Sequence, residues 1–193
     1  MSLCKRLLAM TIIPDTHLHF AFGTSKADSN LHLEELTLTE AADLLITHRE
    51  GQKDGRYFVP AKFSTPYRNA ANVVNWSGCC IDIDRDTDRS EIETKLAGIA
   101  YVAHSTYKPG RARVFVPYSQ PVPTKKHQEI ARALNERIGN VDKCNAKELQ
   151  FFYLPACEPG APRWAFHTLD TAPPRPPNMT YKCRSTIHRN RTC

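Results

Sequence analysis

Two aspartates, Asp82 and Asp84, stand at the end of an apolar run that begins at Cys79. If this run is a β-strand, its period of two places both carboxylates on one face and Ile83 on the other. Carboxylates held this close repel each other unless a cation lies between them, and hard oxygen ligands suit Mg²⁺ or Mn²⁺. The pair predicts a divalent-metal site for phosphoryl transfer on nucleotides. The alternative is a strand that ends in a solvated turn.

A second group of polar residues follows further along the chain. Ser105 and Thr106 end one predicted strand, Arg111 and Arg113 begin the next, and the turn-forming segment 107–110 joins them. Antiparallel pairing would bring the hydroxyls and the guanidinium groups together, and the arginine fork binds phosphate. The cluster predicts a triphosphate site, with a solvated polar hairpin tip as the alternative. His104, one residue before the hydroxyl pair, is interpreted as structural.

A third carboxylate, Asp142, lies between Gly139 and the predicted strand 149–154. A carboxylate from a separate strand is what a two-metal centre requires. The simpler interpretation of Asp142 is a turn residue.

The remaining elements indicate a mixed α+β order with adjacent strands and a central hairpin. Thr37 and Glu40 have the spacing of a capping box, and Asp88 or Ser90 can cap a helix that ends at Leu96. The other helices are expected at 40–48 and 125–138, and the strands at 17–22, 57–60, 79–84, 99–105, 113–118 and 149–154.

The 193 residues fit one domain at 1–170, followed by a Pro-rich, basic linker or tail at 171–193. No apolar run is long enough to span a bilayer, and no secretory signal is recognisable, so we expect no membrane partner and a cytoplasmic location. The net charge of +6 favours an anionic partner such as nucleic acid or nucleotide. The seven cysteines include no CxxC spacing and are interpreted as free thiols.

Taken in chain order, these motifs resemble those of the archaeo-eukaryotic primase superfamily, in particular the primase-polymerase domains of phage and plasmid replication proteins. The resemblance covers roughly residues 50–160. The segments that carry it are Lys53 to Pro60, Arg68-Asn69, Asn72-Val73, Ile81 to Asp84, Ala100 to Thr106, Arg113 to Pro117, Asp142 and Phe151 to Pro155.

The resemblance implies a central antiparallel sheet of the RNA-recognition-motif type, flanked by helices, with the carboxylates at its open face. It assigns the divalent metals to Asp82, Asp84 and Asp142. The family's Ser-x-His motif, which contacts the nucleotide phosphates, is replaced here. Arg113 is interpreted as standing in the histidine's place, and the other implied nucleotide-binding residues are Ser105, Thr106, Arg111 and Arg68.

The implied activity is that of a DNA primase/polymerase, which performs metal-dependent, template-directed nucleotidyl transfer during replication of a mobile genetic element. The implied partners are a single-stranded DNA template, nucleoside triphosphates and a helicase, to which relatives are often fused.

Two other functions remain open from the sequence. A replication-initiation module could keep the fold and bind nucleic acid without catalysis. The segment from Asp82 to Thr87 also comes close to the hhhDxDxT motif of haloacid-dehalogenase-like phosphatases, in which Asp82 would be the nucleophile and Asp84 the general acid. That enzyme needs a parallel, doubly wound sheet, whereas this chain has a predicted hairpin soon after the motif.

Overall fold

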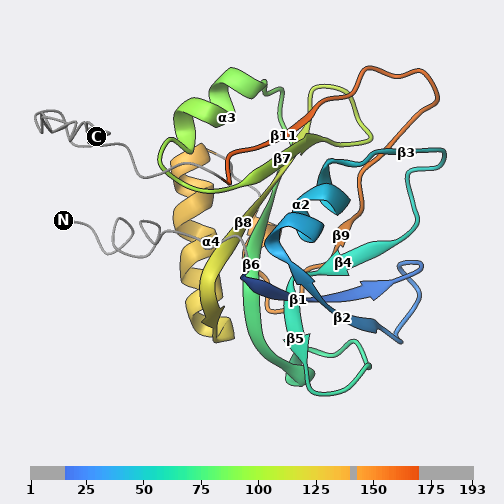
Figure 1. The fold of residues 1–193 in the computed structure, drawn as a ribbon, viewed down its shortest axis with the longest axis vertical. Helices are drawn as coiled ribbons and strands as arrows, with labels where there is room; N and C mark the ends of the chain where they lie inside the picture. The colour runs from blue at the N-terminus through green and yellow to red at the C-terminus, as the bar shows by residue number, and fades with distance from the viewer. Residues whose placement is uncertain (1–15, 140–142, 170–193) are drawn as a thin grey trace, which may run out of the picture.

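The computed structural model describes residues 16–139 and 143–169. Its central element is a five-stranded sheet in the order β11-β7-β8-β6-β5, and every neighbouring pair is antiparallel. The strands are β5 (Ala61–Phe63), β6 (Val73–Ile83), β7 (Val102–Ser105), β8 (Ala112–Val122) and β11 (Ala165–His167). The two long strands, β6 and β8, lie side by side at the centre (Figure 1). The phosphatase alternative is wrong, because it requires a parallel, doubly wound sheet, whereas Asp82 lies in an antiparallel sheet.

A second, four-stranded sheet has the order β2-β1-β4-β9 and is also antiparallel. Its strands are β1 (His17–Gly23), β2 (His32–Thr37), β4 (Tyr57–Val59) and β9 (Phe152–Tyr153), and a short parallel pair joins β3 (Arg49–Glu50) to β10 (Ala156–Cys157). The strand predicted at 149–154 is shorter than expected. Since β4 has only three residues, its ladder with β9 extends only over Phe152 and Tyr153.

Three helices lie among the described residues, together with the 3₁₀ turns η1 (Ala70–Asn72) and η2 (Lys143–Ala146). The first, α2 (Leu38–Ile46), begins with the predicted capping box of Thr37 and Glu40. The second, α3 (Arg89–Lys95), is capped by Asp88 rather than by Ser90. The third, α4 (Thr124–Ile138), ends at Gly139, whose φ of 76° suits a glycine because it has no Cβ.

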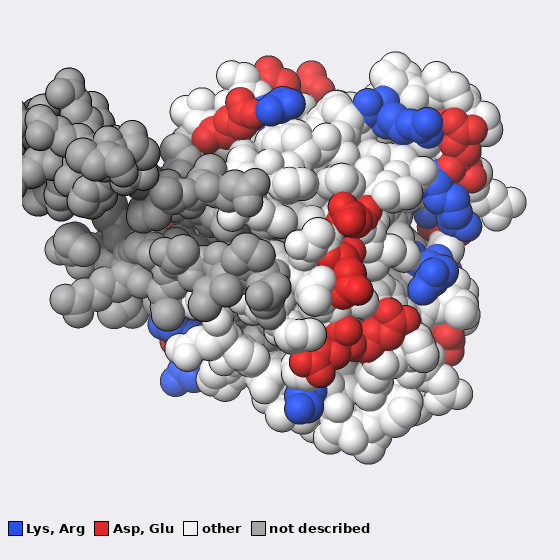
Figure 2. Space-filling view, in the orientation of Figure 1, with Lys and Arg blue, Asp and Glu red and all other residues white. Residues whose placement is uncertain are grey.

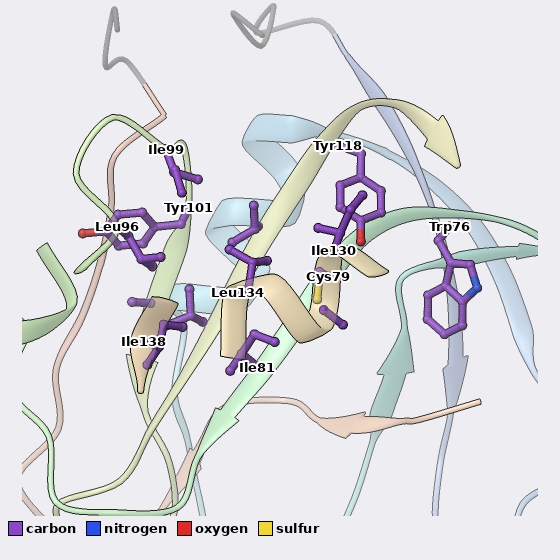
Figure 3. Packing of buried hydrophobic residues seen from close by; sticks show 14 of the residues in the cluster. Trp76, Cys79, Ile81, Leu96, Ile99, Tyr101, Tyr118, Ile130, Leu134 and Ile138 are labelled. Carbon is purple, nitrogen blue, oxygen red and sulfur yellow. The ribbon is translucent and has the colours of Figure 1, made fainter. Parts of the chain in front are cut away.

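The two faces of the five-stranded sheet are covered differently, with α4 on one face and α2 on the other (Figure 1). Cys79 and Ile81 of β6 pack toward α4, as Figure 3 shows with Leu134 and Ile138. Cys80, between them, joins the α2 cluster instead. Because side chains alternate along a strand, Asp82 lies on the α2 face, away from the core that α4 closes.

The predicted α+β class, with antiparallel sheets and flanking helices, is therefore confirmed. The strand expected at 99–105 begins only at Val102, because the Ile99 N–H donates to the Leu96 carbonyl at 3.0 Å and prolongs the turn after α3. No helix within residues 16–139 and 143–169 is long and apolar enough to cross a membrane. The tail predicted at 171–193 and the candidate ligand Asp142 lie outside the described residues.

Candidate active site

A pocket of about 430 Å³ opens where β6 and β7 end and β8 begins, and the segment 150–156 forms its opposite wall. The polar lining is dominated by charge. Four cationic and two anionic side chains contribute to it, and they are Lys53, Lys108, Arg111, Arg113, Asp82 and Asp84. The surplus of positive charge favours an anionic ligand.

Strand register brings three of the lining residues into one row across the sheet. Asp82 of β6 lies opposite Arg113 of β8, and Arg113 lies opposite His104 of β7. Residues directly opposite each other in neighbouring strands point to the same face. All three side chains therefore face the pocket.

Asp82 and Arg113 form a two-pronged ion pair. Arg113 Nε donates to Asp82 Oδ1 at 2.5 Å and Nη2 donates to Oδ2 at 3.1 Å, while Nη1 donates to the carbonyl of Tyr153. The Arg113 side chain is only 10% exposed and that of Asp82 is 25% exposed. Burial of the guanidinium opposes its charge, but the attraction of Asp82 raises the pKa of Arg113 above its ordinary value.

Asp84 and Arg111 repeat this pairing at the mouth of the pocket. Arg111 Nη1 donates to Asp84 Oδ1 at 2.6 Å, and the two side chains are 34% and 57% exposed. The two predicted carboxylates and the two predicted arginines are thus brought together. The direct ion pairs between them were not predicted.

The backbone of Asp82 is held by a side chain that the sequence analysis missed. The Asp82 N–H donates to Asn145 Oδ1 at 3.1 Å, and Asn145 Nδ2 donates to the Asp82 carbonyl at 3.3 Å and to Asn135 Oδ1 at 3.1 Å. The ladder of β6 with β5 reaches only Trp76, so the Asn145 amide takes the place of a strand further along β6. A sequence signal exists in Asn135, which interrupts the buried face of α4.

This contact also explains how closely Asp82 and Arg113 approach. Since the N–H and C=O of Asp82 both point toward Asn145, Asp82 and Arg113 form the non-hydrogen-bonded type of cross-strand pair. Side chains lie closest in that type of pair. Asn145 therefore fixes the strand end from which the carboxylate projects.

The two predicted hydroxyls have different surroundings. Thr106 lines the pocket, and its N–H donates to the carbonyl of Arg111 at 3.0 Å, which closes the hairpin. The Ser105 hydroxyl instead accepts from the Trp164 N–H at 3.1 Å and lies 3.3 Å from His48 Nε2. Ser105 supports the wall of the pocket rather than lining it.

Arg68 lies behind the opposite wall. Its guanidinium carbon is 5.1 Å from the ring centres of both Tyr57 and Phe151, and Nη2 donates to the carbonyl of Lys26 at 2.7 Å. Phe151 lines the pocket, whereas Arg68 does not. The structure thus places Arg68 where it positions an aromatic wall.

The oxygen donors at the mouth of the pocket suit a metal that is shared with a ligand. Within residues 16–139 and 143–169, no group of three or more His, Cys, Asp or Glu side chains could hold a metal ion. Mg²⁺ at nucleotide sites is, however, commonly held by one or two carboxylates together with substrate phosphates. Asp82 and Asp84 fit that arrangement, provided that Arg113 and Arg111 release their carboxylates.

The model of the VapE N-terminal domain matches residues 10–175, and the chain belongs to this family. The solved structure of the AEP domain of the cyanophage S-2L primase-polymerase (PrimPol) is similar at 16% identity and a TM-score of 0.44, over 83% of this chain and 84% of that chain. No curated protein matches the sequence. The recognition made from the motifs, a primase-polymerase domain of a phage or plasmid replication protein, is confirmed.

Proposed function

We propose that this domain is a DNA primase/polymerase that performs metal-dependent, template-directed nucleotidyl transfer during replication of a mobile genetic element. The fold would be the archaeo-eukaryotic primase core, with the five-stranded sheet as its RNA-recognition-motif-like element. The observation that supports the proposal is the pocket itself, in which Asp82 and Asp84 meet four cationic side chains. Carboxylates for a metal and cations for phosphates are both needed for phosphoryl transfer.

The metal would be Mg²⁺ or Mn²⁺, held by Asp82 and Asp84 and, as the family resemblance implies, by Asp142. When bound, it would supply Lewis-acid stabilisation of the charge that develops on the transferring phosphate. Asn145, three residues beyond Asp142 in the chain, hydrogen-bonds to the Asp82 backbone, so the turn η2 supports the same site.

The cationic side chains would bind the triphosphate. Arg113 and Arg111 neutralise carboxylates in the free protein, and each becomes available to phosphate when its carboxylate binds metal. Thr106 lies beside them in the pocket lining and would add a hydroxyl contact. Ser105 and Arg68, which the resemblance assigns to nucleotide binding, would act by positioning the pocket walls.

The single-stranded template would approach from the basic side of the molecule. Figure 2 shows a band of acidic side chains across the face that carries α2 and β2, while Lys and Arg side chains, with a few acidic ones between them, lie toward β3. The exposed carboxylates of this region include Glu35, Glu40 and Asp43. Like charges repel a phosphate backbone, so the template is expected to avoid this face. A helicase remains the proposed protein partner.

The test is primer extension on a single-stranded template with labelled nucleotides and Mg²⁺ or Mn²⁺. Asp84→Asn is the informative variant, because Asp84 is more than half exposed and its loss should leave the fold intact. Loss of a metal ligand worth several kcal/mol predicts a fall in rate of at least about 100-fold. Glu93→Gln is the matched control, since Glu93 is also an exposed carboxylate paired with an arginine, at 2.7 Å.

The competing function is a replication-initiation module that binds nucleic acid without catalysis. Wild-type protein that binds single-stranded DNA yet makes no product with either metal would establish the module and refute the polymerase. Equal losses of activity in Asp84→Asn and Glu93→Gln would refute the assigned site.

A further inference from the structure

His104 has a fixed tautomer. His104 is among the residues that line the pocket, it is 2% exposed, and its Nδ1 lies 2.9 Å from the carbonyl oxygen of Ser105. A carbonyl only accepts, so Nδ1 carries the proton. Burial, and then the nearby charge of Arg113, lowers the pKa of His104 to about 3, so the ring is neutral at physiological pH. Nε2 is consequently a hydrogen-bond acceptor.

Within the described part of the chain, His104 Nε2 is buried and has no hydrogen-bond partner. A buried acceptor without a donor is destabilising, and nearly all such groups in folded proteins are satisfied. Its neighbour across the strands is Arg113, whose guanidinium donates to Asp82 and to the carbonyl of Tyr153. Nε2 therefore has no donor among the described residues, and a ligand in the pocket could supply one.

The chemistry of a nucleoside triphosphate limits which of its groups can be this donor. Phosphate oxygens are acceptors at neutral pH, and the pocket already offers them cations. The hydrogen-bond donors of the bases differ from base to base, whereas a template-directed enzyme must admit all of them. The sugar hydroxyls are the remaining donors, and they do not vary with the base.

We propose that His104 Nε2 accepts a hydrogen bond from a sugar hydroxyl of the nucleotide that binds in this pocket. The proposal rests on the proposed function, because it takes a nucleotide as the ligand. Nε2 has no contact with solvent in the free protein, so the hydroxyl reaches it only after a neighbouring side chain moves. Arg113 is directly opposite, and metal binding at Asp82 would release it.

The test is equilibrium binding to the wild-type protein in the presence of Mg²⁺ and without template. The ligands are ATP, 2′-deoxy-ATP, 3′-deoxy-ATP and 2′,3′-dideoxy-ATP. A net hydrogen bond corresponds to about a tenfold change in affinity. We expect the dideoxy compound to bind about tenfold more weakly than ATP, and the single deoxy compound that shares this loss identifies the hydroxyl.

Two variants assign the effect to His104. His104→Phe should bind all four nucleotides with the same affinity. Its melting temperature should change little, because removal of the unpartnered acceptor offsets the loss of the hydrogen bond from Nδ1 to the Ser105 carbonyl. His48→Phe is the matched control. His48 Nε2 lies 2.9 Å from the same Ser105 carbonyl, but His48 does not line the pocket. This control should keep the preference for the hydroxyl.

The outcomes separate the two proposals. Equal affinity of the wild type for ATP and the dideoxy compound overturns the role of His104 and leaves the proposed function standing. Absence of binding by every nucleotide overturns both. A hydroxyl preference that survives in His104→Phe assigns the hydroxyl to another residue and also overturns the role. The wild-type comparison needs no substitution, so it decides the question even if His104→Phe fails to fold.

Discussion

The ion pair of Asp82 and Arg113 should contribute much more to stability than its neighbour at the mouth of the pocket. In Asp82→Asn, the guanidinium of Arg113, whose side chain is 10% exposed, faces a neutral amide. Breaking a fully buried pair costs about 3–5 kcal/mol. Asp82 is a quarter exposed, so we expect the lower end, about 3 kcal/mol. In a protein of this size that loss corresponds to a melting temperature lowered by roughly 6–12 °C.

The assay is a double-mutant cycle with Asp82→Asn, Arg113→Met and the double variant, followed by urea unfolding, because urea does not screen charge as guanidinium chloride does. The expected coupling energy is about 2 kcal/mol. The matched control is the same cycle on Asp84 and Arg111, whose side chains are 57% and 34% exposed. An exposed pair should give a coupling energy below about 1 kcal/mol that falls further with salt.

Equal and small coupling energies in the two cycles would refute the reasoning, because burial would then not distinguish the pairs. The cycle also bears on the activity assay. Asp82 has a structural role through Arg113, so the loss of activity in an Asp82 variant mixes unfolding with lost chemistry. Asp84 lacks that complication and is the better residue for testing catalysis.

Three further predictions concern two buried histidines, the Asn145 contact and the close packing at Gly78 of β6. Burial lowers the pKa of both His104 and His127 from 6.5 to about 3. Below pH 6.5 the unfolded chain therefore binds more protons than the folded one, and stability must decrease as the pH is lowered. At pH 5 each histidine should cost about 2 kcal/mol relative to pH 7.5, and urea unfolding that is identical at the two pH values would contradict this. Asn145→Ala removes both hydrogen bonds to the Asp82 backbone and should cost about 2 kcal/mol. Exchange of the Asp82 amide hydrogen should accelerate at least about tenfold, and an unchanged rate would show that Asn145 does not protect it. Gly78→Ala should lower stability by about 1–3 kcal/mol in the same urea assay, because a Cβ there would lie 2.3 Å from the Phe115 ring and 3.0 Å from the Val116 carbonyl oxygen.

Local patterns in the sequence predicted the parts of the site that depend on neighbouring residues. Alternation along 79–84 predicted that Asp82 and Asp84 share the face opposite Ile83, and the turn at 107–110 predicted the antiparallel pairing of the strands that carry Ser105 and Arg113. The ion pairs depend on strand register, which the segments show only once they are paired. The contact of Asn145 with Asp82 spans 63 residues, and no periodicity encodes an approach of that kind. The sequence indicates a structural role for His104 from its place at a strand end, whereas its unpartnered nitrogen is a property of the packed pocket, which the sequence does not show.

Under the proposed function, the pairing of both carboxylates with arginines couples the binding of the metal to the binding of the triphosphate. A metal at Asp82 and Asp84 must displace Arg113 and Arg111 from those oxygens. The displaced guanidinium groups are then without anionic partners in a pocket that already holds Lys53 and Lys108. A triphosphate supplies those partners, so metal and triphosphate should each raise the affinity of the other. This coupling is reciprocal by thermodynamic necessity, and the arginines that weaken metal binding alone are the groups that make the joint binding of metal and nucleotide favourable.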